Sequence, residues 1–297
     1  MQVTIGMLYI SIATLLPPIN VRFIYIFLSR KHYRDMECYR IMALTGILQL
    51  FAGPGAFSCG LMQVLGSDPR GILLFFVILF SASIASEVVL NLVLALNRVK
   101  VILNIHTAPC LSKVIKTSDR MWQPLQLLII LACLYGLSYA TALLSPYCGY
   151  LMVPGHYVGS YDFSKPYTQL FSKVNSLVLL TSSFLTFICY MLITVNLLWM
   201  RSKSTVTPNK EWSIAIYGGV RFTIDTSLSI AFFFMHLPPS PWSELVIGLT
   251  YILNQLFVSP LLYFTLTKNL RNEFLSLLRI QRRNHISTAI YRTSSHA

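Results

Sequence analysis

Three ionisable side chains lie inside long apolar stretches of the sequence. Glu87 is the one charged residue between Gly71 and Asn97, and Arg221 and Asp225 interrupt a second apolar stretch. A charge in such surroundings is costly, so these residues are candidates for function. Arg221 and Asp225 are four residues apart, a spacing that lets them pair on one helix face. An internal ion pair that holds helices in register and a role in ligand binding or switching both fit this pattern. Glu87 is compatible with a protonated carboxyl, a hydrogen bond near Asn91 or part of an ion site.

The sequence contains no familiar catalytic or metal-binding pattern. It lacks the HExxH and GxSxG strings and a phosphate-binding lysine loop, and its six cysteines form no CxxC pair. The histidines are scattered along the chain. We therefore predict a protein that is not an enzyme, with no cofactor and no metal site.

Composition favours a protein that crosses a membrane several times. The residues are 55% hydrophobic and only 11% charged, whereas soluble domains average about 45–50% apolar and about 25% charged residues. The net charge of +13 is distributed among short segments between apolar runs, which argues against nucleic acid as a partner. The lipid bilayer is the expected environment of a single integral domain.

The apolar runs predict seven transmembrane helices. The longest run, from Gly71 to Arg98, would extend roughly 37 Å as a helix, enough to cross a hydrocarbon core of about 30 Å. Pro17 and Pro18 are expected to kink the first span, and Gly53-Pro54-Gly55 interrupts the second. The seven predicted spans are residues 3–28, 41–65, 72–96, 125–144, 174–200, 213–237 and 244–265.

Basic residues indicate the orientation of these spans. Lys and Arg recur in the segments after the first, third and fifth spans and in residues 268–297, whereas the alternating segments hold only Arg70, Lys165 and Lys173. Because Lys and Arg concentrate on the cytosolic side, we predict an extracellular N-terminus and a cytosolic C-terminal tail. This orientation places Cys59 and Cys148 outside the cell, where a disulfide between them and two unpaired thiols are both compatible with the sequence.

Two spans end in motifs that suit a switch. Asn97 and Arg98 close the third span, and Pro260 precedes Tyr263 by three residues near the end of the seventh. Pro260 weakens a helical turn and would allow a hinge, although an ordinary proline kink explains the same residue. Arg98 could form an ion pair that breaks when the bundle opens, although a plain membrane anchor explains it equally. After the seventh span, Leu270, Phe274 and Leu277 have the spacing of a short amphipathic helix on the membrane surface.

With these pieces placed, the chain resembles the rhodopsin-like seven-helix receptors, and among them most closely the nematode serpentine chemoreceptors of class T. The resemblance rests on three strings: Cys38-Tyr39-Arg40-Ile41-Met42, Leu94-Ala95-Leu96-Asn97-Arg98 and Ser259-Pro260-Leu261-Leu262-Tyr263. Two positions depart from the family pattern, since Asn97 stands where the family has an acidic residue and Ser259 where it has asparagine. The family's cysteine at the start of the third helix is also absent, because residues 69–76 contain none.

The resemblance implies an all-α, seven-transmembrane receptor in the plasma membrane of a sensory-neuron cilium. It would bind a small odorant or pheromone-like ligand and signal to a heterotrimeric G protein; association into oligomers is left open. Asn97, Arg98, Pro260 and Tyr263 would serve switching and coupling. The candidate ligand-binding residues, in the outer halves of the third, sixth and seventh helices, are Phe76, Phe80, Ser83, Phe233, His236 and Tyr251. A ligand-gated channel, a transporter and a non-signalling membrane protein are the alternatives.

Overall fold

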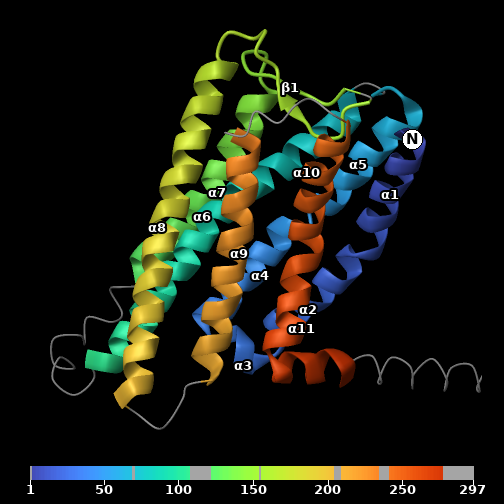
Figure 1. Ribbon diagram of the computed structural model, residues 1–297. Coiled ribbons are helices and arrows are strands. Elements are labelled where there is room, and N and C mark those ends of the chain that lie inside the picture. The colour runs from blue at the N-terminus through green and yellow to red at the C-terminus, as the bar shows by residue number, and fades with distance from the viewer. Residues whose placement is uncertain are drawn as a thin grey trace, which may run out of the picture.

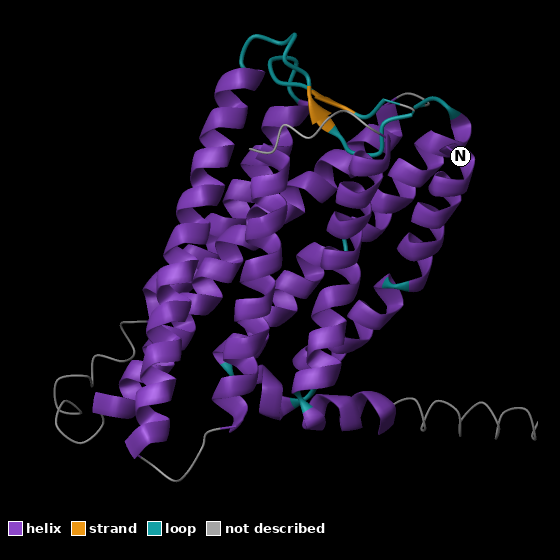
Figure 2. Ribbon diagram, in the orientation of Figure 1, coloured by secondary structure: helices purple, strands orange, loops and turns teal. Residues whose placement is uncertain are grey.

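The computed structural model is a bundle of long, side-by-side helices (Figures 1 and 2) and describes residues 2–68, 71–107, 122–153, 155–203, 209–233 and 241–276. Seven helical units make up the described bundle. In chain order they are α1 (Gln2–Leu15) with α2 (Pro17–Ser29), α4 (Glu37–Gln49) with α5 (Ala52–Leu65), α6 (Ile72–Thr107), α7 (Trp122–Leu144), α8 (Thr168–Lys203), α9 (Asn209–Phe233), and α10 (Pro241–Leu253) with η3 (Asn254–Val258) and α11 (Ser259–Leu266).

The two ends of the bundle differ. At one end the strands β1 (Tyr150–Leu151) and β2 (Ser160–Tyr161) form a small antiparallel hairpin in which Tyr150 pairs with Tyr161. We call this the hairpin end, and the N-terminus of the chain lies at the same end of the bundle (Figure 1). The opposite end carries the short helix α3 (Lys31–Arg34) and the helix of residues 268–276, and we call it the basic end.

Six helical stretches among the described residues are long and apolar enough to cross a membrane, and they cover six of the seven units. The remaining unit, α9, is less apolar because it contains Arg221 and Asp225. Arg221 is only 1% exposed. The charges of α9 therefore point into the bundle, where neighbouring helices can pair them and spare the lipid-facing side.

The breaks in the first, second and seventh units follow from proline. The first unit bends at Leu16, directly before Pro17. In the second unit Pro54 has no N–H for the carbonyl of Leu50, which accepts instead from the Gly53 N–H at 3.0 Å. The predicted interruptions at these sites are confirmed as local bends within continuous spans.

The long helix α6 lies at the centre of the bundle. It packs against α4, α5, α7, α8 and α9, and its buried positions include the small residues Ala82, Ala85 and Ala95. Small side chains let helices approach closely, which is the main route to tight packing where lipid surrounds the protein. Polar side chains of α6 can therefore form hydrogen bonds or ion pairs with several neighbouring helices.

The helix of residues 268–276 lies crosswise at the basic end (Figure 1). Leu270 is fully buried, and the ring of Phe274 stacks on Phe23 of α2 with centroids 4.9 Å apart. The guanidinium of Arg22 lies 4.9 Å from the centre of the Phe274 ring. The predicted amphipathic helix is present with Leu270 and Phe274 facing the bundle, whereas Leu277 lies outside the described residues.

Candidate functional site

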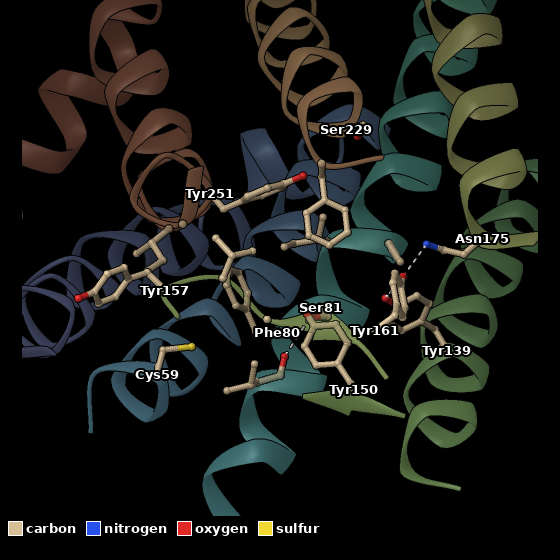
Figure 3. Close-up of a pocket in the computed structure, with 18 of the residues that line it drawn as sticks. Cys59, Phe80, Ser81, Tyr139, Tyr150, Tyr157, Tyr161, Asn175, Ser229 and Tyr251 are labelled. Carbon is tan, nitrogen blue, oxygen red and sulfur yellow. Dashed lines mark hydrogen bonds between the residues drawn. The ribbon is translucent and has the colours of Figure 1, made fainter. Parts of the chain in front are cut away.

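A cavity lies inside the bundle beneath the β1–β2 hairpin. Its space is about 770 Å³ including the part that opens to solvent. Among its described lining residues none is charged. The polar groups come mainly from tyrosines: Tyr9, Tyr139, Tyr150, Tyr157, Tyr161 and Tyr251. Figure 3 shows Tyr139, Tyr150, Tyr157, Tyr161 and Tyr251 around the cavity. The walls are thus largely apolar, with a few hydroxyl groups.

Residues 155–161 form a cover over this cavity. Gln63 of α5 fixes the cover from below, since its amide donates to the His156 carbonyl at 2.6 Å and accepts from the Gly155 N–H at 2.9 Å. Glu244 of α10 accepts from the Tyr157 N–H at 3.1 Å and lies 2.9 Å from His156 Nδ1. Tyr157, Val158, Gly159 and Tyr161 of this cover line the cavity, so two helices hold the segment that closes it.

The base of the hairpin is fixed by polar contacts of its own. Asp162 accepts hydrogen bonds from the hydroxyl of Ser164 at 2.6 Å and from its N–H at 3.1 Å. These bonds, together with the Lys165 cation, lower the pKa of Asp162 below its usual value. Lys165 Nζ also donates to the Cys148 carbonyl at 2.9 Å. The hairpin is therefore tied down at its base as well as over the cavity.

One wall of the cavity carries a chain of hydrogen bonds. Tyr135 donates its hydroxyl to Asn175 Oδ1 at 2.5 Å, and Asn175 Nδ2 donates to the Tyr161 hydroxyl at 3.2 Å. The hydroxyls of Tyr161 and Tyr139 are 2.8 Å apart. Figure 3 shows Tyr139, Tyr161 and Asn175 together on this wall. This chain joins α7, α8 and β2.

A buried network of charges lies in the middle of the bundle. Arg221 of α9 forms an ion pair with Glu87 of α6 and lies 3.6 Å from Asp225. Arg221 also donates to the Asn254 carbonyl at 2.6 Å. Asp225 accepts from the amide of Asn254 at 2.6 Å and from the amide of Asn91 at 2.8 Å. Every charged group of this network has a partner from another helix, as a buried charge requires.

The network continues toward the basic end. Gln49 of α4 donates to Glu87 at 2.5 Å and to the Ser259 hydroxyl at 3.0 Å. The Tyr217 hydroxyl is 3.4 Å from that of Ser259 and 3.0 Å from that of Tyr263. Hydrogen bonds therefore connect α4, α6, α9 and α11 across the bundle.

The π-helical turn η3 provides carbonyls for this network. Pro260 has no N–H to offer the carbonyl of Leu256 four residues earlier, and that carbonyl accepts from the amide of Asn20 in α2 at 2.7 Å. Freed carbonyls inside a membrane must find partners within the protein. Asn20 and Arg221 supply them here, so the seventh unit is held by side chains of α2 and α9.

The cavity and the network share helices. On α9, Ser229 lines the cavity and donates to the carbonyl of Asp225 one turn below, at 2.8 Å. On the seventh unit, Tyr251 lines the cavity three residues before Asn254. A molecule in the cavity would thus contact helices that the buried charges hold together.

This architecture matches a known fold. No protein-family model and no curated protein matches the sequence. Among solved structures, the crystal structure of squid rhodopsin superposes with a TM-score of 0.70, covering 93% of this chain and 84% of that one at 12% identity. The chain has the rhodopsin fold.

The rhodopsin fold places the predicted ligand-binding residues unequally. Phe80 and Tyr251 line the cavity. Phe76 and Ser83 do not: Ser83 is buried and donates to the carbonyl of Phe80 at 2.7 Å. They lie on α6 within about one turn of Phe80, but neither is among the residues that line the cavity. The side chain of Phe233 and the whole of His236 lie outside the described residues.

Several cavity residues were not among the sequence-based candidates. Tyr9 comes from α1, Tyr139 from α7, Asn175 from α8, and Tyr157 and Tyr161 from the cover. The tyrosine-rich composition of residues 145–173 was the one feature of the sequence that could have pointed to these cavity residues. Which tyrosine faces the cavity depends on the path of the hairpin.

The predicted switch residues lie at the basic half of the rhodopsin fold. Asn97 and Arg98 are buried, at 1% and 4% exposure, and Arg98 lies near enough to Tyr190 of α8 to act on it electrostatically. Tyr263 stacks on Tyr217 with ring centroids 5.1 Å apart. A plain lipid anchor would have its charge at the surface, so burial argues against that interpretation of Arg98.

Cys59 and Cys148 are free thiols, and the disulfide that the sequence allowed is not formed. Cys59 lines the cavity, whereas Cys148 is buried at the base of the hairpin. Among the described residues, no group of three His, Cys, Asp or Glu side chains could hold a metal ion.

Proposed function

We propose that this chain is a G-protein-coupled chemosensory receptor of the plasma membrane that detects a small odorant or pheromone-like molecule. The observation that carries the proposal is the shared use of α9 and the seventh unit by the cavity and by the buried network. Ser229 and Tyr251 line the cavity one turn from Asp225 and Asn254. A ligand that prefers one packing of these helices shifts their equilibrium by its difference in affinity for the two states.

In this proposal the hairpin end faces outward and the basic end faces the cytosol. The concentration of Lys and Arg after the first, third and fifth spans supports this orientation. The ligand then enters beneath the cover, and Arg98 lies at the side where a G protein binds. Basic residues near the membrane also suit the anionic inner leaflet. The class T chemoreceptor resemblance of the three motif strings supports a chemosensory ligand.

The chemistry of the cavity supports a neutral ligand. A cationic ligand would need a carboxylate partner in the cavity wall, because an unpaired charge in a largely apolar site is strongly unfavourable. None of the described lining residues supplies one. Uncharged volatile and pheromone-like compounds fit a cavity whose walls are largely apolar.

A cell assay tests the proposed function. Cells that express the chain are exposed to a ligand panel while second-messenger output is recorded for the wild type, for Arg98→Ala and for Arg34→Ala at matched surface expression. Arg34 is an exposed residue of α3 and serves as the control. We expect ligand responses that Arg98→Ala abolishes or distorts and Arg34→Ala retains. Ion currents or solute flux without dependence on a G protein would favour a channel or transporter instead.

A further inference from the structure

Four hydroxyls of the cavity wall donate their hydrogen to a backbone carbonyl. Tyr251 donates to the Leu228 carbonyl at 3.0 Å, and Tyr9 donates to the Tyr157 carbonyl at 3.4 Å. Ser229 donates to the carbonyl of Asp225, and Ser81 to that of Val77 at 3.1 Å. A hydroxyl group has a single hydrogen. These four groups therefore offer a ligand only acceptor oxygens.

The pair Tyr139 and Tyr161 is different. Its two hydroxyls have two hydrogens but share one hydrogen bond, at 2.8 Å. Asn175 Nδ2 donates to Tyr161, so this contact consumes a lone pair and no hydroxyl hydrogen. One hydrogen of the pair is left without an acceptor among the described bonds, whichever tyrosine donates to the other.

The leftover hydrogen is buried and belongs to the cavity wall. Tyr139 and Tyr161 are 5% and 9% exposed, and both line the cavity. Burial raises the pKa of Tyr161, so its hydroxyl keeps the hydrogen. A buried donor without a partner is unfavourable, because it has lost its hydrogen bond to water. A ligand that accepts this hydrogen bond removes that penalty.

We infer that the cavity selects uncharged, mostly apolar molecules with an acceptor oxygen, such as ketones, and that the Tyr139–Tyr161 pair donates the hydrogen bond that recognises this oxygen. This inference rests on the proposed function for its ligand-binding role and adds the ligand class. The rest of the ligand lies against the apolar wall, which includes Phe80, Val77 and Ile252.

The hydrogen count makes an unusual prediction for variants. Tyr139→Phe leaves Tyr161 with a hydrogen that no longer has an acceptor, and Tyr161→Phe leaves Tyr139 with one. Each single variant therefore keeps a donor, and only the double variant loses both.

Binding is measured on the purified full chain in detergent as the shift of its Tm. The probes are methyl ketones of six to ten carbons, each compared with the alkane in which the carbonyl is a CH2 group and with the primary amine of the same length. The ratio of apparent affinities for ketone and alkane is taken within each variant, so general effects of a substitution on folding cancel. Tyr25→Phe, at an exposed position of α2 outside the cavity lining, is the control.

We expect the wild type, both single variants and the control to prefer the ketone, and the double variant to lose about tenfold of that preference, or about 1.4 kcal/mol. Any of four results would overturn the inference. These are equal binding of ketone and alkane by the wild type, no ketone binding, a preference for the amine, and an unchanged ketone-to-alkane ratio in the double variant. Because binding is measured without a G protein, ketone binding without signalling would contradict the proposed function alone. Signalling by charged ligands would contradict the ligand class alone.

Discussion

The guanidinium of Arg221 lies between two carboxylates, forming an ion pair with Glu87 and lying 3.6 Å from Asp225. Glu87 belongs to α6 and the other two residues to α9. The side chains of Arg221 and Glu87 are 1% and 2% exposed. One cation thus serves a buried carboxylate and a partly buried one, and the Arg221–Glu87 pair holds α9 against the central helix.

This arrangement predicts unequal effects of removing either partner. Arg221→Gln leaves the buried Glu87 and the partly buried Asp225 without a cation, whereas Glu87→Gln leaves Arg221 with Asp225. We expect Arg221→Gln to lower the free energy of unfolding by about 3–5 kcal/mol, as for other broken buried pairs, and Glu87→Gln to lower it by less. The Tm of each purified variant gives the order, with the exposed Arg34→Gln as a control that stays near the wild-type Tm. A larger loss for Glu87→Gln would show that the shared cation is not the main stabilising element.

The glycines predict which helix contacts have no room for a larger side chain. A Cβ on Gly60 of α5 would lie 2.6 Å from the carbonyl oxygen of Gly6 in α1, whereas a Cβ on Gly219 of α9 would meet nothing within 4 Å. We expect Gly60→Ala to destabilise the protein by about 1–3 kcal/mol and Gly219→Ala to be neutral or stabilising by up to about 1 kcal/mol. Thermal unfolding of the two variants is the measurement. Equal Tm values would contradict the close approach of α1 and α5.

The cover over the cavity predicts a kinetic effect. Gln63 is 1% exposed and makes two hydrogen bonds to the backbone of residues 155 and 156. Gln63→Leu keeps a similar volume and removes both bonds, so we expect ligand dissociation to become about tenfold faster. The rate is followed as the decay of the response after washout of the best-binding ketone. Gln126→Leu, at an exposed position of α7, is the matched control; unchanged decay in Gln63→Leu would indicate that the cover does not limit ligand exit.

The tyrosine pair at the basic half predicts a coupling between α9 and α11. Tyr217 and Tyr263 share one hydrogen bond of 3.0 Å, so either Phe substitution removes it. We expect each single variant to lose about 1 kcal/mol of stability, and the double variant to lose little more, because the same bond is lost only once. Tm values of the three variants test this, with Tyr25→Phe at the 58% exposed Tyr25 as control. Fully additive losses would mean that the two hydroxyls act separately.

Sequence patterns predicted the architecture because a membrane places strong demands on composition. Spans of about 20 apolar residues are needed to cross the hydrocarbon core, and the runs beginning near Val3, Ile41 and Ile72 meet this demand locally. The kinks at Pro17 and Pro260 were also predictable, since a missing N–H acts on the same turn of helix. The amphipathic spacing of Leu270 and Phe274 was visible for the same reason.

The tertiary structure alone decided the site. Sequence spacing paired Arg221 with Asp225, but the main partner of Arg221 is Glu87, 134 residues away. Likewise, Tyr9 of the first unit and Tyr161 of the hairpin line the cavity, whereas Phe76 and Ser83 do not. Apolar runs and prolines act within a few residues of the chain, so the sequence determined the seven spans and their bends. Pairing and cavity walls depend on the rotation of each helix and on which helices become neighbours, and only packing of the whole bundle sets these.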